Sequence, residues 1–552
     1  MTTPEPQESH AAAKNRTHRR RSSVSEAHQI YLQYHREAHH DDGSDSRKAT
    51  QISTDGSTNK APKRHDSTES RDHKPVTSFP MFHRVQKTGV IYATSRAAAR
   101  GFQGDGDPSS EWANMGQGAP ETGPLPNAPS RNFTMHIPDA ELEYAPVTGL
   151  TPLREKVADY YNFLYRQGKQ SQYTAENVCI VPGGRAGITR IMAVLGTVQV
   201  GYFTPDYTAY EQALGLFLRV SPSPLLHRDV TEACMSPEEF DFQCGGRGCG
   251  AILMSNPANP TGQSIEGDDL RRYVQTARDH QTAIIMDEFY SYVISLVLAC
   301  ATEAGCLPGT HEDFLFENAI SHYYYDGPDQ PLDGNTNDLH SWPKTVSSAA
   351  YVDDVDEDPI LIVNGLTKNW RCPGFRVCWI VAPKPIVKML GSAGSYLDGG
   401  ANAPLQRLAL PLMELAFIRR DAIALQQHFR QKRDFLLRKL EELGIKVKFK
   451  PTSTFYVWAD LSGLPPPLND CLVFLEECTK HKCICVPGVF FDINPRGIRN
   501  IRMSKCLHHV RFSYGPPMEN LTKGMELICQ MIQYWKKCPE PPDAYATESF
   551  GE

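Results

Sequence analysis

Lys368 stands in a stretch of sequence that suits both carbonyl and phosphate chemistry. Thr367 precedes it directly, and Arg376 follows eight residues later, beyond the turn that Pro373-Gly374 predicts. A lysine amine can condense with an aldehyde, while a hydroxyl and a guanidinium can together bind a phosphate. Pyridoxal phosphate (PLP) carries an aldehyde and a phosphate, so this spacing is the arrangement needed to hold that cofactor.

Two further segments carry groups that PLP requires. Asp287 ends the apolar run 284–286, and Tyr290 follows three residues later. A carboxylate at the pyridine nitrogen makes the ring an electron sink, and a tyrosine hydroxyl can donate to the phenolate oxygen. Asn259, within the string Asn-Pro-Ala-Asn-Pro-Thr-Gly (256–262), can donate to the same oxygen. The prolines and the glycine of that string shape the turn that presents it.

In this order, the three segments resemble the motifs of the class I/II aminotransferases, which are fold-type-I PLP-dependent enzymes. The resemblance extends over residues 79–534, most of the chain outside its N-terminal tail. It implies a phosphate cup at Gly184, Arg185 and Ala186 with Thr367 and Arg376, a ring-stacking Tyr207, a Tyr144 that reaches the phosphate of the neighbouring subunit, and a substrate pocket at Arg511, Asn259 and Gly118. The last of these tyrosines implies a homodimer with shared active sites.

The sequence departs from the family pattern at two cofactor positions. Arg185 stands where relatives carry small or hydroxyl residues, and Gly365 stands where many have a hydroxyl. Nearby Arg371 could replace the missing phosphate contact or lie on the surface. For Tyr207, a packed core tyrosine is the alternative to a ring-stacking one.

The reaction implied by the resemblance is transamination between an L-amino acid and a 2-oxo acid. Lys368, Asp287 and Tyr207 are the expected catalytic residues, with the freed lysine amine as general base and Arg511 as the clamp for the substrate carboxylate. The alternative is a lyase resembling 1-aminocyclopropane-1-carboxylate synthase or a C–S lyase, which uses the same machinery. No arginine in residues 391–404 offers a second cation, which favours an apolar, aromatic or unusual amino acid over a dicarboxylic one.

The elements that must position these residues alternate along the chain. Strand-like runs are expected at 177–181, 251–255 and 283–286, and helices at 150–167 and 268–280. This alternation predicts an α/β large domain with a mainly parallel sheet covered by helices, and the change of pattern after Pro404 predicts a smaller α+β domain. The expected divisions are a disordered tail (1–78), an arm with part of the small domain (79–143), the large PLP-binding domain (144–403), the C-terminal small domain (404–538) and a flexible tail (539–552).

Within the large domain, residues 292–321 interrupt an otherwise continuous pattern. They are interpreted as an insertion, either a genuine surface loop or an artefact of the gene model.

Composition limits the remaining function classes. The net charge of −7 over 552 residues gives no reason to expect a nucleic-acid partner, and no apolar run is long enough to span a bilayer. The 15 cysteines lack regular spacing, which fits reduced thiols in the cytoplasm. Cys478, His481, Cys483 and Cys485 do not follow a zinc pattern and are expected in the core, so no metal is predicted.

Overall fold

The structure is a computed structural model that describes residues 87, 89–105, 110–131, 133–139, 142–225, 233–291, 342–500 and 503–537. Three predicted segments lie outside these described residues, namely the N-terminal tail, the insertion at 292–321 and the C-terminal tail. The predicted domain boundaries after residues 143 and 403 stay predictions.

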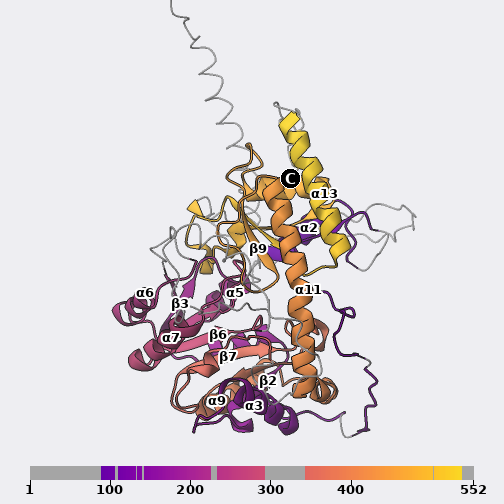
Figure 1. The fold of residues 1–552 in the computed structure, drawn as a ribbon. Coiled ribbons are helices and arrows are strands. Elements are labelled where there is room, and N and C mark those ends of the chain that lie inside the picture. Colours follow the sequence, from indigo (N-terminus) through magenta and orange to yellow (C-terminus); the bar gives the residue numbers. More distant parts are fainter. Residues whose placement is uncertain are drawn as a thin grey trace, which may run out of the picture. The chain divides into compact units, whose positions relative to one another are not determined.

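A seven-stranded sheet forms the centre of the fold (Figure 1). Its strands are β2 (Val178–Val181), β3 (Val198–Phe203), β4 (Val220–Leu225), β5 (Ala251–Ser255), β6 (Ala283–Asp287), β7 (Ile360–Gly365) and β8 (Cys378–Val381). In space their order is β2-β8-β7-β6-β5-β3-β4, and only β8 runs antiparallel to its neighbours. The predicted α/β class with a mainly parallel sheet is therefore confirmed.

Helices cover this sheet because its strands are apolar on both faces. Every residue of β2, β5, β7 and β8 is buried, as expected for strands enclosed between two layers. The helices of this part are α3 (Thr151–Tyr165), α4 (Gly184–Val194), α5 (Ala209–Leu216), α6 (Pro237–Asp241), α7 (Gly267–His280), α9 (Lys384–Leu397) and α10 (Ala403–Ala409). The predicted helices at 150–167 and 268–280 thus form, within one to two residues, as α3 and α7.

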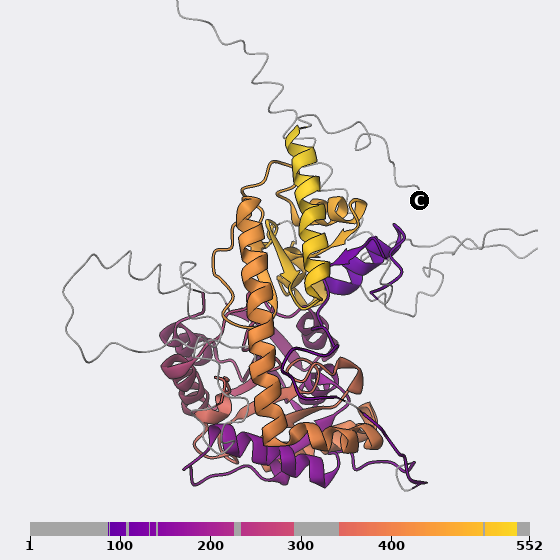
Figure 2. The ribbon, with the colours of Figure 1, turned by 45° about the vertical axis from the view of Figure 1, so that its right-hand side comes forward.

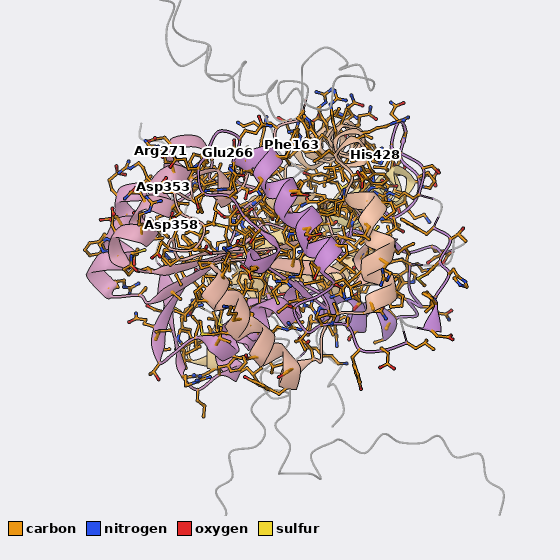
Figure 3. All side chains as sticks on the ribbon, turned by 90° about the horizontal axis from the view of Figure 1, so that it is seen from below. Phe163, Glu266, Arg271, Asp353, Asp358 and His428 are labelled. Carbon is orange, nitrogen blue, oxygen red and sulfur yellow. The ribbon has the colours of Figure 1, made fainter. Side chains whose placement is uncertain are left out.

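The helix α7 shows how local sequence fixes an element and the elements beside it. Its first turn carries acidic residues and its last turn basic ones, which complements the helix dipole. Arg278, in the last turn, pairs with Asp353 and Asp358 at 3.0 and 2.6 Å, and Figure 3 labels both carboxylates. Because β7 starts two residues after Asp358, this pair ties the beginning of β7 to α7.

Smaller sheets accompany the C-terminal part of the chain. Antiparallel strands β9 (Tyr456–Asp460), β12 (His509–Ser513) and β11 (Val486–Pro487) form one sheet, with β12 in the middle. Strands β1 (Ala113–Asn114) and β10 (Cys483–Ile484) pair in parallel. Helices α2 (Gly89–Ala98), α12 (Cys471–Lys480) and α13 (Met518–Lys537) accompany these strands. This α+β arrangement agrees with the second part of the predicted fold class.

The helix α11 (Leu415–Glu442) is the longest element and connects the two parts. In Figures 1 and 2 it runs from the level of α3 up to α13. Before α11 begins, η8 (Leu410–Met413), which contains Pro411, separates it from α10. His428 and Lys432 of α11 both contact the Glu121 carboxylate, so the helix anchors the segment that contains Gly118.

None of the described helices is long and apolar enough to cross a bilayer.

Candidate active site

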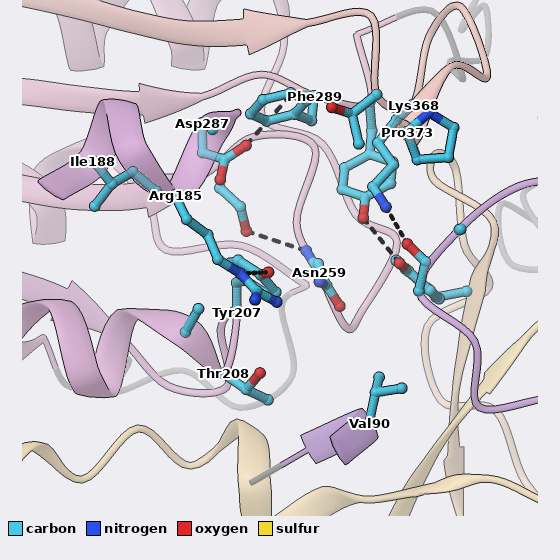
Figure 4. A pocket seen from close by; sticks show the side chains of 18 of the residues that line it. Val90, Arg185, Ile188, Tyr207, Thr208, Asn259, Asp287, Phe289, Lys368 and Pro373 are labelled. Atoms are coloured by element: carbon cyan, nitrogen blue, oxygen red, sulfur yellow. Dashed lines mark hydrogen bonds between the residues drawn. The ribbon is translucent and has the colours of Figure 1, made fainter. Parts of the chain in front are cut away.

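A cavity of about 480 Å³ opens where several parallel strands end (Figure 4). The turns after β3, β5 and β7 bring Tyr207, Asn259 and Lys368 to its wall, and the end of β6 brings Asp287 there. Ligands bind at this edge in open α/β sheets because the connecting loops all meet there. The predicted site residues that line the cavity are Gly118, Gly184, Arg185, Tyr207, Asn259, Asp287, Tyr290, Thr367, Lys368, Arg376 and Arg511.

Lys368 presents its amine inside this cavity. Its Nζ donates a hydrogen bond to the carbonyl oxygen of Gly118. Burial, and then the positive charges of Arg511 and Arg185, lower the pKa of Lys368 from 10.5 to about 7, while Asp287 opposes the shift. A large share of this amine is therefore neutral and nucleophilic at neutral pH, as carbonyl chemistry requires.

Asp287 lies at the end of β6, where its side chain is 5% exposed. It accepts hydrogen bonds from the Tyr210 hydroxyl at 2.8 Å and from the Phe289 N–H at 3.4 Å. Burial raises its pKa to about 6, against the effect of these donors and of Lys368. The sequence did not single out Tyr210, which lies in the first turn of α5, three residues after Tyr207.

The start of α4 also lines the cavity, at Gly184 and Arg185. The first N–H groups of a helix have no intrahelical partner and attract negative charge. Gly183, just before α4, has φ 109°, and a Cβ there would lie 1.9 Å from a guanidinium nitrogen of Arg376. A Cβ on Gly184 would lie 2.5 Å from the ring of Phe289. Only glycines allow the arginine and the helix end to approach this closely.

Arg511 also lines the cavity and is 2% exposed. Its Nη1 donates to Asn259 Oδ1 at 2.9 Å, and its Nη2 donates to the Gly116 carbonyl at 3.0 Å. Among the described residues its Nε has no hydrogen-bond partner. Because a guanidinium has five N–H donors, donors remain for a bound carboxylate.

Tyr290 pairs with Tyr456, a residue that the sequence analysis did not name. Their hydroxyl oxygens are 2.9 Å apart, and burial raises the pKa of Tyr290 well above its usual value. The Tyr456 ring lies under Arg511, with 4.0 Å between the ring centroid and the guanidinium carbon. Tyr456 lies in β9, and the alternation of side chains along a strand is the signal that could have indicated that it faces the cavity.

Two predicted cofactor residues do not line the cavity. Ala186 lies in the first turn of α4, behind Arg185. Tyr144 is 95% exposed, and its predicted contact with a neighbouring subunit stays a prediction. Arg185 does line the cavity, and its Nε donates to the Tyr207 hydroxyl at 3.0 Å.

Arg371 lies in neither of the two places that the sequence analysis considered for it. Arg371 is 1% exposed and points away from the cavity, donating to the Gly123 carbonyl at 2.7 Å. Its φ of 54° turns the chain after Lys368 and thereby directs the side chain. It therefore neither binds in the cavity nor lies on the surface. Asn402 caps α10 by accepting a hydrogen bond from Leu405 N–H.

The cysteines named in the sequence analysis lie in the core around α12. Cys478, Cys483 and Cys485 are fully buried, and burial raises the pKa of the Cys478 thiol. Among the described residues, no group of three or more histidine, cysteine, aspartate or glutamate side chains is arranged to hold a metal ion.

Comparison with known proteins finds chains that are similar to this one. The family model described as aminotransferase class I and II matches residues 110–305 and 311–527. The aspartate/prephenate aminotransferase of Thermus thermophilus is 22% identical over 402 residues, which are 72% of this chain and 85% of that protein. The aspartate aminotransferase of Pyrococcus horikoshii is 22% identical over 393 residues, 71% of this chain and 83% of the relative.

A solved structure of similar fold is the aspartate aminotransferase from Thermus thermophilus with maleate. It has a TM-score of 0.57 and 20% identity, and the match covers 80% of this chain and 96% of that one. This likeness supports the fold described above.

Proposed function

The chain belongs to the class I and II aminotransferase family, and from that membership we propose how its own residues carry out the family reaction. The protein is a PLP-dependent aminotransferase. The observation that carries the proposed site is the meeting of a low-pKa lysine, a buried aspartate and a buried arginine around one cavity.

The residues of the cavity fit PLP. The close approach of Arg376 to Gly183 makes a cradle that a Cβ would fill, and such a cradle suits a phosphate group. Thr367, beside this cradle, would add a hydroxyl to it. We propose that Lys368 holds the cofactor aldehyde carbon and that Asp287 faces the ring nitrogen. When bound, PLP supplies an electron-withdrawing ring that makes the Cα–H bond of the substrate acidic.

Other side chains would fix the cofactor ring. Tyr207 lines the same cavity as Asp287, which supports the proposal that it stacks on the ring. Asn259 and Tyr290 would donate to the phenolate oxygen. Arg185, which pairs with the Tyr207 hydroxyl, would hold that ring in place.

The reaction needs a base and a fixed substrate. Lys368 Nζ, neutral at a pH near its lowered pKa, would accept the proton from the substrate Cα and return it. Arg511 would bind the α-carboxylate with its remaining donors, which orients the Cα–H bond. The apolar rings of Tyr456 and Phe491 around Arg511 exclude water and strengthen this pair.

We also propose that the donor is a dicarboxylic amino acid. In the described chain no residue of 391–404, the segment in which the sequence analysis sought a second cation, lines the cavity. Arg185 does line it, and its guanidinium is exposed there. With Arg376 assigned to phosphate and Arg511 to the α-carboxylate, Arg185 is available for a second carboxylate. Two relatives described above are named for aspartate.

A homodimer with shared sites is proposed from exposed apolar side chains. Leu142, Tyr144 and Tyr396 are 78%, 95% and 70% exposed. Leu142 and Tyr144 are close in sequence, and contiguous exposed apolar surface marks interaction sites. Sedimentation should give a dimer, and mixing a K368A chain with a Y144A chain should restore activity, because one hybrid site then has both residues. No recovery from two inactive but dimeric variants would contradict sharing.

A cytoplasmic location is also proposed. No disulfide joins any two of the described cysteines, which agrees with a reducing compartment. Fractionation of source cells with an antibody against the protein would test this.

The first experiment on function is a donor panel. Purified holoenzyme is mixed with single amino acids without a 2-oxo acid, and the visible absorption band of the lysine-bound cofactor is followed. Loss of the band with aspartate or glutamate, and its return with a 2-oxo acid, is the expected result. A band that persists while ammonia or an elimination product accumulates would instead indicate the lyase alternative.

A further inference from the structure

A buried carboxylate next to the cavity has no role in the reaction outlined above. Asp206 lies in the turn between β3 and α5, does not line the cavity and is 3% exposed. Its Oδ1 accepts a hydrogen bond from the Tyr207 N–H at 2.7 Å and another from the Ser255 hydroxyl. Its Oδ2 accepts from the Ser255 N–H at 3.3 Å. A side chain that costs free energy to bury is thus fully engaged with two neighbours of the site.

The contact with Ser255 sets the direction of a hydrogen-bond chain. A serine hydroxyl has one hydrogen, and Ser255 gives it to Asp206. The oxygen of the same hydroxyl is then an acceptor for the Asn259 N–H, at 3.1 Å. Asn259 in turn accepts from Arg511 Nη1 through its side-chain oxygen. Asn259, labelled in Figure 4, and Ser255 both line the cavity.

A second route leads from Asp206 to the same arginine. The Asp206 N–H donates to the Phe491 carbonyl at 3.0 Å. The Phe491 ring centroid lies 5.0 Å from the guanidinium carbon of Arg511. Asp206 therefore reaches Arg511 through β5 on one side and through η9 (Gly488–Phe491) on the other.

We propose that Asp206 is a positioning residue that fixes Arg511, through Ser255 and Asn259, for the substrate α-carboxylate, and fixes Tyr207 through its backbone. The inference rests on the proposed role of Arg511 as carboxylate clamp. A change at Ser255 separates these two effects of Asp206, because the Ser255 hydroxyl belongs only to the hydrogen-bond chain that leads to Arg511. Removing that hydroxyl should disturb the clamp and leave Tyr207 in place.

The test measures how tightly a non-reacting dicarboxylic acid, such as maleate, binds to the holoenzyme, by the change that it causes in cofactor absorbance. The variants are S255A, D206N, R511A and the double variant S255A/R511A. Asp206→Asn keeps an acceptor oxygen for Tyr207 and Ser255 without a charge. Ser236→Ala is the matched control, because this serine caps α6 with its hydroxyl and does not line the cavity.

The expected pattern is one of non-additive losses. S255A should weaken binding about tenfold, as loss of one buried hydrogen bond does, and R511A should weaken it more. S255A should have no further effect in the R511A background, because a residue that acts through Arg511 cannot act in its absence. The PLP affinity of S255A should equal that of S236A, and D206N should weaken maleate binding less than S255A.

Three outcomes would overturn the inference. If S255A binds maleate normally while R511A binds it more weakly, the hydrogen-bond chain through Ser255 does not position Arg511. The role of Arg511 as carboxylate clamp would then still stand. An additive loss in the double variant would show that Ser255 acts by another path. Normal binding by R511A would refute the clamp role itself, so failure of the proposed function is distinguishable from failure of this inference.

Discussion

The lowered pKa of Lys368 can be tested directly in the cofactor-free enzyme. With a pKa of about 7, about half of the lysine side chains are neutral at pH 7. A lysine with the ordinary value of 10.5 would be neutral in about one molecule in 3,000. The cavity therefore raises the share of reactive amine by about three orders of magnitude.

The assay is competitive labelling. Cofactor-free enzyme is pulsed with a small amine-reactive anhydride from about pH 5 to pH 11, and peptide mass spectrometry gives the labelling rate of Lys368. The rate should rise through a midpoint near 7, because only the neutral amine reacts and a lowered pKa frees it at lower pH. Lys388, exposed on α9, monitors the reagent at each pH.

A variant separates the causes of the shift. Arg511 is the second contribution after burial, so R511A should move the midpoint upward only part of the way to 10.5. A midpoint near 10 in the unchanged enzyme would refute the reasoning. A labelling midpoint that is the same in R511A as in the unchanged enzyme would refute only the contribution of the Arg511 charge to the lowered pKa of Lys368.

Three further outcomes are expected. R511A should lower kcat/KM for the amino donor by about 100-fold, in steady-state kinetics, since a buried charge partner of the substrate is lost; a change below threefold would contradict the clamp. Y210F should raise the pKa of Asp287 above about 6, because the lost donor stabilised the carboxylate, and should move the acid limb of the kcat/KM profile to higher pH; an unmoved limb argues against it. G183A should weaken PLP binding at least about tenfold by absorbance titration, since its Cβ meets a guanidinium at 1.9 Å; Gly374→Ala, with open space around its Cβ, is the control and should bind normally.

The alternation of strand-like and helix-like stretches, together with the resemblance to the aminotransferase motifs, predicted the fold class and named residues that meet at one cavity. Lys368 and Asn259 each follow a short buried strand and Asp287 ends one, and the strand ends of a parallel sheet share one edge. Their order along the chain therefore carried spatial information. Their individual roles stay predictions.

Residues that enter the cavity from separate elements were missed. Tyr456 comes from β9 and Phe491 from η9, and nothing in their neighbouring sequence indicates which strand or helix they face. Arg371 shows the opposite error, because it is three residues from Lys368 yet a left-handed backbone turns its side chain away. The spacing of residues along the chain does not show which distant segments come into contact. It also does not show where the backbone turns at a single residue.

The buried thiols around α12 can be used to measure local opening of the structure. Cys478 and Cys485 are inaccessible in the C-terminal part, as is Cys179 in β2 of the large sheet. A buried thiol is labelled only when its surroundings open, so its native-state labelling rate measures the free energy of that opening. Equal rates for the two groups would mean that both sheets open together. A faster rate around α12 would mean that the C-terminal part comes apart independently, as a separate domain at 404–538 requires.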